Sequence, residues 1–291
     1  MPPVAVVPQF SEETSSEIVA SRLLKDESRL AQFLATLVRH VHEAVREARP
    51  TASDWRQAIQ FLTAVGHASD DRRQEWILLS DLLGLTALVE EINARRPKGA
   101  TPNTPRGPFY RAAAPHYEDG ASISLDANGE ALQVSCRVTD LDGKPIPGAT
   151  IDTWQANAEG HYENQQPDRQ PDFNLRGRFT TDDNGLVRYR SIKPAGYAVP
   201  DDGPVGQLLG SIGYPLRRPA HLQFIVMAPG FETITTHVYD RHDPQIADDA
   251  LLGVRTELLG DFRERKSASR RSWSLDYTFV MARSRTGRRA A

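Results

Sequence analysis

The segment Arg217-Arg218-Pro219-Ala220-His221-Leu222-Gln223-Phe224 alternates between polar and apolar side chains after its proline. Side chains two positions apart on a β-strand point to the same face. His221 and Gln223 are therefore expected on one face of a strand. The opposite face would carry Leu222, Phe224 and Val226. On its own, a histidine in a strand more often makes structural hydrogen bonds than binds a metal. The segment alone therefore predicts a strand but not a metal site.

The second half of the chain has the period of β-strands. Apolar side chains occupy every second position in two runs, Leu132-Val134-Cys136-Val138 and Trp273-Leu275-Tyr277-Phe279-Met281. Turn-forming residues separate such runs at Asp142-Gly143, Asp183-Asn184-Gly185 and Pro229-Gly230. We therefore expect a mainly β domain, built as an antiparallel β-sandwich.

The first half has the period of helices. Apolar residues form one stripe at helical spacing, namely Leu30, Phe33, Leu34, Leu37, Val38 and Val41, and Pro50 ends that helix. Thr51 and Asp54 have the pattern of an N-cap that opens a second helix. Ser69 and Asp70 are expected to start a third helix that carries Trp76, Ile77, Leu83, Leu88 and Ile92.

A proline-rich segment, residues 96–105, marks the boundary between these halves. We expect an α-helical N-terminal domain with its linker over residues 1–100 and the β-sandwich over 101–282. Residues 283–291 carry four arginines and are expected to form a disordered basic tail. The apolar stripe either packs against a second copy of the chain or covers the sandwich of its own chain.

The composition is that of an ordinary soluble globular protein: 291 residues, 25% of them charged and 39% hydrophobic. The net charge of −3 gives no general attraction for nucleic acid. No apolar run approaches the roughly 20 residues that span a bilayer. The single Cys136 cannot form an internal disulfide and is expected to be a buried structural thiol, which suits a reducing compartment. We therefore expect a cytoplasmic protein that binds neither nucleic acid nor membrane.

Two tyrosines upstream of the opening segment lie in unusual surroundings. Tyr162 follows Trp154-Gln155-Ala156-Asn157-Ala158-Glu159-Gly160-His161, and Tyr197 lies in a loop rich in glycine and proline, residues 194–204. Either tyrosine alone would be an ordinary half-buried aromatic residue. Together with His221 they are the residue types of a tyrosinate and imidazole iron(III) site.

At this point the chain resembles the intradiol ring-cleavage dioxygenases, which include the catechol and hydroxyquinol 1,2-dioxygenases. The resemblance covers most of residues 15–282. Its motifs are Gln74-Glu75-Trp76-Ile77-Leu78-Leu79-Ser80-Asp81, Gly107-Pro108-Phe109-Tyr110, Pro145-Ile146-Pro147-Gly148-Ala149, Asp172-Phe173-Asn174-Leu175-Arg176, Arg218-Pro219-Ala220-His221 and Trp273-Ser274-Leu275-Asp276-Tyr277. Ser80-Asp81 and Gly203-Pro204-Val205-Gly206-Gln207-Leu208-Leu209 are similar to the hydroxyquinol branch.

The resemblance implies a non-haem Fe(III) ion, for which the motifs give ligand roles to Tyr162, Tyr197 and His221 and place Gln223 at the fourth ligand position. A trivalent ion can hold a tyrosine deprotonated far below its free pKa of about 10. The implied substrates are a small aromatic diol and O2. Tyr197 would take a proton from the diol, and Arg218 would stabilise charge that develops on the ring. The product would be maleylacetate from hydroxyquinol (benzene-1,2,4-triol) or a muconate from a catechol.

By the same resemblance, the substrate pocket is lined by Asp81, Gly107, Pro108, Phe109, Val199, Pro200 and Arg218. Asp81 would bind a third ring hydroxyl, whereas Phe109 and Val199 are equally compatible with ordinary core packing. Arg106 stands where the family usually has an aliphatic residue, and it either lies at the pocket rim or points to solvent. Family members dimerise through their N-terminal helices, so a homodimer is expected.

The chain departs from the family at Gln223, where the family has a second histidine ligand. A glutamine carbonyl is a neutral and weaker donor than imidazole. Three interpretations remain open at this level. In the first, Gln223 coordinates the iron through its oxygen, or a water molecule takes the fourth ligand position, and the protein is a weakened dioxygenase. The protein has instead lost ring cleavage and binds aromatics or catalyses a non-oxidative reaction. The third is that His237, which the hydroxyquinol branch often carries beside a full ligand set, substitutes for the missing ligand.

Overall fold

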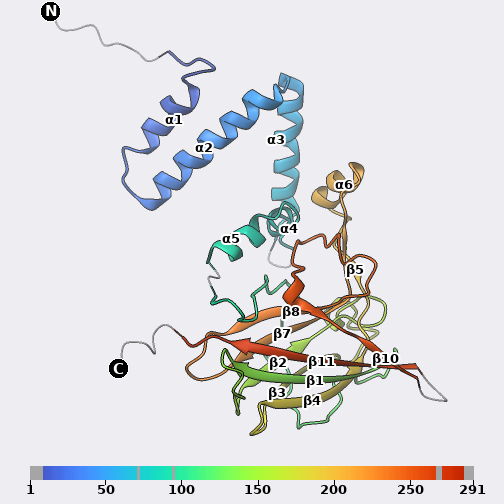
Figure 1. The fold of residues 1–291 in the computed structure, drawn as a ribbon. Coiled ribbons are helices and arrows are strands. Elements are labelled where there is room, and N and C mark those ends of the chain that lie inside the picture. Colours follow the sequence, from blue (N-terminus) through green and yellow to red (C-terminus); the bar gives the residue numbers. More distant parts are fainter. Residues whose placement is uncertain (1–8, 71–72, 94–95, 267–270, 285–291) are drawn as a thin grey trace, which may run out of the picture. The chain divides into compact units, whose positions relative to one another are not determined.

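A computed structural model describes residues 9–70, 73–93, 96–266 and 271–284 (Figure 1). The described residues divide into two compact units, within residues 1–64 and 65–291. The predicted tail lies almost wholly outside the described residues. No helix among the described ranges is long and apolar enough to cross a membrane.

The first unit contains helices α1 (Ser15–Leu23), α2 (Arg29–Ala48) and most of α3 (Ala52–His67). Ser28 caps α2 by accepting a hydrogen bond from the Ala31 backbone N–H at 3.2 Å. The predicted start of the next helix is confirmed, because the Asp54 N–H donates to Thr51 Oγ1 at 3.2 Å and the Thr51 N–H donates to Asp54 Oδ2 at 2.9 Å. Pro50 follows the end of α2, as expected.

The prediction of one continuous third helix from Ser69 is wrong. The segment forms two short helices, α4 (Glu75–Leu82) and α5 (Leu85–Asn93). Gly84 separates them with a left-handed backbone, φ +72°, which a regular helix cannot contain. The helix that carries Asp81 therefore ends directly after it, and this break was hidden by the continuous apolar periodicity of the sequence.

The second unit contains a β-sandwich. One sheet has the strand order β10-β11-β1-β4 and the other β3-β2-β7-β8-β9. The bounds are β1 Ala131–Asp140, β2 Thr150–Trp154, β3 Arg176–Thr180, β4 Leu186–Ile192, β7 His221–Met227, β8 Ile234–Asp240, β9 Leu259–Gly260, β10 Arg263–Lys266 and β11 Arg271–Met281. A small ribbon pairs β5 (Tyr197–Ala198) with β6 (Arg217–Arg218), and the remaining elements are α6 (Pro204–Ser211) and the 3-10 turns η1 (Glu163–Gln165) and η2 (Thr256–Leu258).

The expected sandwich with a helical N-terminal region is confirmed, but its sheets are mixed rather than purely antiparallel. β1 pairs in parallel with β11 over ten residues, from Ala131 opposite Ser272 to Asp140 opposite Met281. β8 and β9 are also parallel. The side-chain period of two is the same in parallel and antiparallel strands, so the sequence pattern could not distinguish them.

The two sheets enclose one apolar core. Alternate residues of β1 and β11 contribute to it, and so do Leu222, Phe224 and Val226 of β7. Cys136 is buried in the same core as a free thiol, as predicted. The opposite face of β7 carries Ile225, which packs with Trp154 and Tyr162 in a second cluster. The predicted division of β7 into two faces is therefore confirmed.

Candidate functional site

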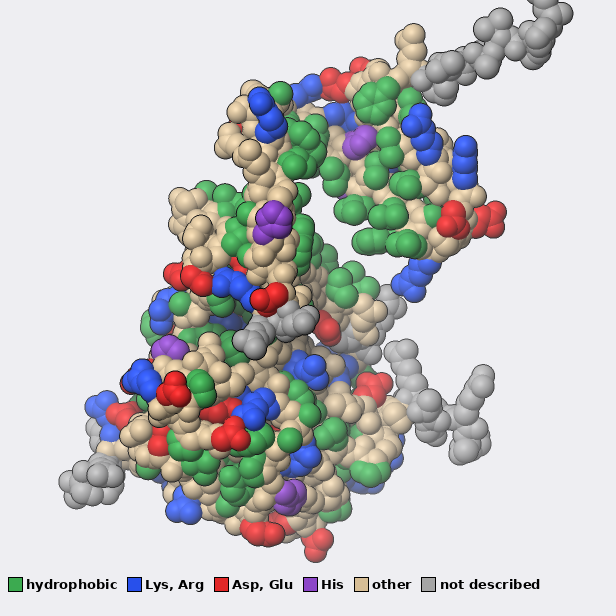
Figure 2. All heavy atoms as spheres, turned by 180° about the vertical axis from the view of Figure 1, so that it is seen from behind, with side chains coloured by type: hydrophobic (Ala, Val, Ile, Leu, Met, Phe, Trp, Pro, Cys, Tyr) green, Lys and Arg blue, Asp and Glu red, His purple; other side chains and the backbone are tan. Residues whose placement is uncertain are grey.

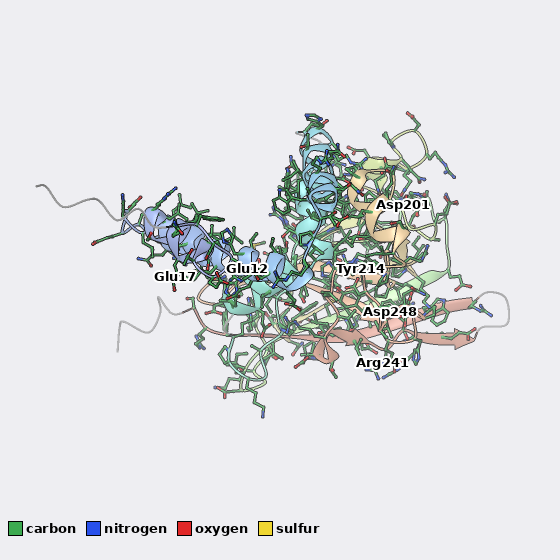
Figure 3. All side chains as sticks on the ribbon, turned by 90° about the horizontal axis from the view of Figure 1, so that it is seen from above. Glu12, Glu17, Asp201, Tyr214, Arg241 and Asp248 are labelled. Atoms are coloured by element: carbon green, nitrogen blue, oxygen red, sulfur yellow. The ribbon has the colours of Figure 1, made fainter. Side chains whose placement is uncertain are left out.

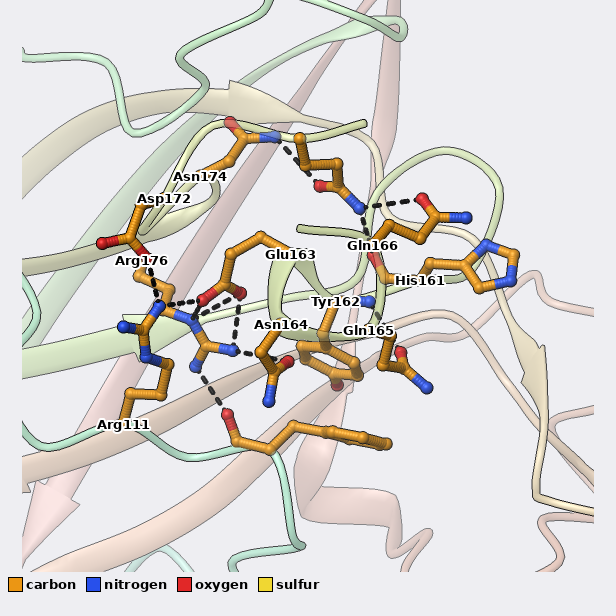
Figure 4. Close-up of polar contacts among 12 residues, drawn as sticks. Arg111, His161, Tyr162, Glu163, Asn164, Gln165, Gln166, Asp172, Asn174 and Arg176 are labelled. Carbon is orange, nitrogen blue, oxygen red and sulfur yellow. Dashed lines mark hydrogen bonds and ion pairs between the residues drawn. The ribbon is translucent and has the colours of Figure 1, made fainter. Parts of the chain in front are cut away.

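Tyr162 is held in place by a buried ion pair (Figure 4). The residue that follows it, Glu163, binds Arg176 of β3 at 2.7 Å, and both side chains are almost fully buried. Arg111 binds the same carboxylate at 2.7 Å. Arg176 also donates to the Phe109 carbonyl at 2.6 Å, and the Phe109 ring stacks on the Tyr162 ring at a centroid distance of 4.4 Å. This network fixes the loop that presents Tyr162.

Tyr197 approaches Tyr162 from the β5–β6 ribbon, in which it is paired with Arg218. The two hydroxyl oxygens are 3.5 Å apart. Gly160 makes this approach possible: a Cβ there would lie 2.9 Å from the Tyr197 Cβ, and its φ of +86° also favours glycine. Burial, followed by the nearby Tyr197, raises the pKa of the Tyr162 phenol well above its usual value.

His221 lies at the start of β7 with its ring fixed. Its Nδ1–H donates to the Pro219 carbonyl at 2.7 Å, which leaves the lone pair on Nε2. That Nε2 is buried and has no hydrogen-bond partner among the described residues. Burial and the charge of Arg218 lower the pKa of His221 to about 3, so the ring is neutral. A buried imidazole with an unpaired lone pair is a ligand ready for a metal ion.

Gln223 lies two residues further along the same face and reaches Tyr162. Its amide nitrogen donates to the Tyr162 hydroxyl, and its carbonyl oxygen lies 3.1 Å from Nε2 of His237. His237 comes from β8, where it is the direct cross-strand partner of Gln223. Gly107 adjoins the same amide, because a Cβ at this position would lie 3.6 Å from Gln223 Oε1.

Arg218 is buried beside these residues with two polar partners. Its Nε donates to Asp249 at 3.1 Å and its Nη2 donates to the Tyr239 hydroxyl at 2.8 Å. Burial by itself would lower the pKa of the guanidinium, but Tyr239, Tyr197 and Asp249 raise it above its usual value. Arg218 is therefore a fixed positive charge next to the Tyr197 and His221 positions.

Asp81 lies near the end of α4, and its Oδ1 is buried without a hydrogen-bond partner among the described residues. Burial raises the pKa of this carboxyl, and Thr86 and Arg218 oppose only part of that shift. Tyr214, which Figure 3 labels, lies in the segment that follows α6. Its hydroxyl donates to the Leu82 carbonyl at the same helix end. An unpaired buried carboxylate oxygen is costly and indicates a missing hydrogen-bond donor.

The remaining predicted pocket residues are less closely tied to these contacts. Val199 is buried, whereas Pro108 and Pro200 are exposed; their predicted contact with a substrate stays a prediction. Arg106 is exposed and its guanidinium lies 4.9 Å from the centre of the Tyr110 ring.

Sequence reasoning missed Thr104, Glu163, Tyr239 and Asp249. Thr104 belongs to the proline-rich segment that the sequence marks only as a domain boundary, yet it is buried against His237. Tyr239 and Asp249 hold Arg218 through contacts of 21 and 31 residues in sequence separation. Of these four residues, only Tyr239 could have been found from the sequence, because the strand period places it on the same face of β8 as His237.

The donor atoms that meet here are two phenol oxygens and one imidazole nitrogen. The described ranges contain no group of three or more His, Cys, Asp or Glu side chains that could hold a metal. A metal in this site would therefore need tyrosinate ligands, a hard-donor set that suits a highly charged cation. A groove of about 760 Å³ in the first unit is lined by none of the predicted site residues.

Comparisons with known proteins agree on one family. A family model described as "Dioxygenase" matches residues 106–283, and one described as "Catechol dioxygenase N terminus" matches residues 27–101. The chain is 49% identical to a hydroxyquinol 1,2-dioxygenase of Rhizobium sp. (strain MTP-10005), over 94% of this chain and 96% of that protein. It is 42% identical to a 6-chlorohydroxyquinol 1,2-dioxygenase of Cupriavidus pinatubonensis, over 94% and 98%.

A solved structure of a hydroxyquinol 1,2-dioxygenase from Pseudomonas putida DLL-E4 superposes with a TM-score of 0.90 at 36% identity. The match covers 94% of this chain and 99% of that one. Similarity therefore extends across both the helical and the β regions.

The buried pair behind Tyr162 gives a stability prediction. Arg176→Leu leaves Glu163 with less compensation for its buried charge, so we expect the metal-free protein to lose about 3–5 kcal/mol of unfolding free energy. The matched control is Arg169→Leu, which breaks an exposed ion pair with Glu159 and should cost less than about 1 kcal/mol. Urea unfolding measures both; equal losses would contradict the proposed support of the Tyr162 loop.

Proposed function

The chain belongs to the intradiol ring-cleavage dioxygenase family, and we propose that it cleaves hydroxyquinol between the two adjacent hydroxylated carbons to give maleylacetate. The observation that carries this proposal is the convergence of Tyr162, Tyr197 and the unpaired Nε2 of His221. The names of the two relatives described above support hydroxyquinol over other diols as the substrate.

We propose that Tyr162, Tyr197 and His221 are the side chains that hold a ferric ion. Gln223 stands where the family has a fourth ligand, a histidine. Burial raises the pKa of Tyr162, so its phenolate form would need a strongly charged cation bound to it. When bound, ferric iron would supply a Lewis acid that draws electron density from the diol.

The surrounding side chains have separate roles. Tyr197 is half-buried and is the proposed base that accepts the proton of a substrate hydroxyl. Arg218 cannot act as an acid because its pKa is raised. Its guanidinium, fixed by Asp249 and Tyr239, instead stabilises negative charge on the reacting ring.

Asp81 is the proposed determinant of substrate choice. Its unpaired Oδ1 can accept a hydrogen bond from the third hydroxyl of hydroxyquinol, a group that catechol lacks. A site built to bind a hydroxyl discriminates against the analogue without it, since the buried acceptor then stays unpaired.

The alternative function, an aromatic-binding or non-oxidative homologue that has lost ring cleavage, is not favoured. It rested on Gln223 alone. The relatives that share 49% and 42% of their residues with this chain over nearly its whole length carry the names of dioxygenases.

The function is tested by loading the purified protein with iron under aerobic conditions. We expect a visible tyrosinate-to-iron charge-transfer band and oxygen uptake with hydroxyquinol that exceeds the uptake with catechol or protocatechuate. Product analysis should identify maleylacetate. Protein that stays colourless and takes up no iron would contradict the metal site, whereas an iron-bound protein without oxygen uptake would contradict ring cleavage.

Asp81→Asn tests substrate choice. The neutral amide is a weaker acceptor, so kcat/KM for hydroxyquinol should fall by about tenfold, while catechol serves as the internal control. Because the folded-state pKa of Asp81 is raised, its ionised form destabilises the fold at neutral pH. The variant should therefore melt at a higher temperature near pH 7, and this gain should fade toward the free Asp pKa of about 4. Equal losses on both substrates would refute the assignment.

We further propose that the protein is a homodimer that buries the apolar stripe of α2. The other helices of the first unit leave this stripe uncovered, with Leu30 65% and Phe33 63% exposed, and Figure 2 shows hydrophobic side chains gathered on these helices. Sedimentation equilibrium should give a dimer, and Phe33→Glu should shift it toward monomer. Arg39→Glu, at an exposed polar position of the same helix, is the control. A monomeric wild type would contradict the dimer.

A further inference from the structure

Gln223 and His237 form part of a continuous row of buried polar atoms. Thr104, His237, Gln223 and Tyr162 are each at least 95% buried. Thr104 Oγ1 contacts His237 Nδ1, His237 Nε2 lies 3.1 Å from Gln223 Oε1, and Gln223 Nε2 contacts the Tyr162 oxygen. His237 and Gln223, in the middle of the row, therefore each contact one neighbour with one polar atom and the other neighbour with a second.

The direction of one hydrogen bond in this row determines the direction of all the others. A carbonyl oxygen only accepts, so Gln223 Oε1 requires the proton of His237 on Nε2. The Nδ1 atom then carries a lone pair, which Thr104 must satisfy by donating its hydroxyl hydrogen. The amide N–H of Gln223 donates in turn to Tyr162. The row is thus one directed chain that ends on the Tyr162 oxygen.

The reversed chain can satisfy every group only while Tyr162 is a neutral phenol. In that arrangement, the Tyr162 hydroxyl donates to Gln223 Oε1, the amide donates to His237 Nε2, and Nδ1–H donates to Thr104. Once Tyr162 has lost its proton, its oxygen and Gln223 Oε1 are two acceptors without a hydrogen between them. Only a metal ion bound to both oxygens could then hold them together.

We propose that Thr104, His237 and Gln223 form a hydrogen-bond relay that donates to the Tyr162 oxygen, and that Gln223 acts as this donor instead of as a metal ligand. The relay rests on the proposed function, because its purpose is to serve a tyrosinate. It assigns His237 as a positioning residue: its Nε2 is engaged with Gln223 and is not free to replace the missing histidine ligand.

The relay has a consequence for the metal. A hydrogen bond to a tyrosinate withdraws electron density from its oxygen, as partners around a ligand commonly tune a bound metal. Neighbouring hydrogen bonds in a buried chain also strengthen one another. The substitution at position 223 therefore exchanges a fourth protein ligand for a donor that weakens electron donation by Tyr162.

The first test uses protein loaded with gallium(III), a diamagnetic trivalent ion that would hold Tyr162 deprotonated without broadening the histidine signals. Nitrogen-15 chemical shifts of the histidine rings report which nitrogen carries the proton, and the His237→Gln variant identifies the His237 signals. We expect the His237 proton on Nε2. A proton on Nδ1 would overturn the relay, because the amide would then be reversed.

Two matched threonine variants test the start of the relay. Thr104→Val removes the proposed donor to His237 and should shift the Nδ1 signal of that residue. Thr236→Val is the control, since Thr236 adjoins His237 in β8 and its buried hydroxyl has no hydrogen-bond partner in the described structure. Equal shifts in both variants, or none in Thr104→Val, would contradict the assignment of Thr104.

The second test compares Gln223→Leu with Gln223→Glu after iron loading and desalting. If Gln223 is a donor, Gln223→Leu keeps as much iron per chain as wild type, and its charge-transfer band moves to lower energy. Loss of iron from Gln223→Leu but not from Gln223→Glu would identify Gln223 as an oxygen ligand and overturn the proposal. Melting of the metal-free variants checks that both fold.

The two tests separate the relay from the function. A wild-type protein that binds neither iron nor gallium refutes the proposed metal site, and with it the tyrosinate that the relay would serve. A coloured, active wild type with the His237 proton on Nδ1 refutes the relay alone.

Discussion

The structure of the site depends on the pairing of β7 with strands on both of its edges. β2 pairs along one edge and β8 along the other, so the backbone of β7 cannot rotate or shift register. This constraint sends Leu222, Phe224 and Val226 into the sandwich core and leaves His221 and Gln223 on the opposite face. It also places His237 opposite Gln223 and Tyr239 opposite His221. The core and the site are thus two faces of one strand.

The polar face of β7 is buried, so each of its polar atoms needs a partner. His221 is fixed through Nδ1 while its Nε2 has none among the described residues. Gln223 is satisfied at both ends, and Arg218 is held by Asp249 and Tyr239. Two of the buried atoms without a partner among the described residues, His221 Nε2 and Asp81 Oδ1, are those to which we assign metal and substrate. Hydrogen bonds therefore fix the side chains of the site in advance, and the atoms that would bind metal and substrate are left unpaired.

The sequence predicted those parts of the molecule that local patterns determine. The two faces of β7, the cap at Thr51 and the strands around Cys136 and Leu275 follow from periodicity and hydrogen-bonding side chains. Strand direction could not be predicted, because parallel and antiparallel strands share one period. The break at Gly84 was hidden by apolar residues on both sides of it.

Contacts between segments that are distant in the sequence could not be predicted either. Thr104 reaches His237 across 133 residues, and no local pattern announces such a pair. The role of Gln223 depends on these long-range partners. Sequence alone therefore could not decide whether Gln223 is a ligand, leaves a position for water, or marks a protein that has lost ring cleavage.

An anomalous-scattering crystal structure of the iron-loaded protein tests the central claim most directly. We expect iron bonded to Tyr162, Tyr197 and His221, with the Gln223 amide directed at the Tyr162 oxygen. Iron absent from this cluster, or bonded to Gln223 or His237, would contradict the account.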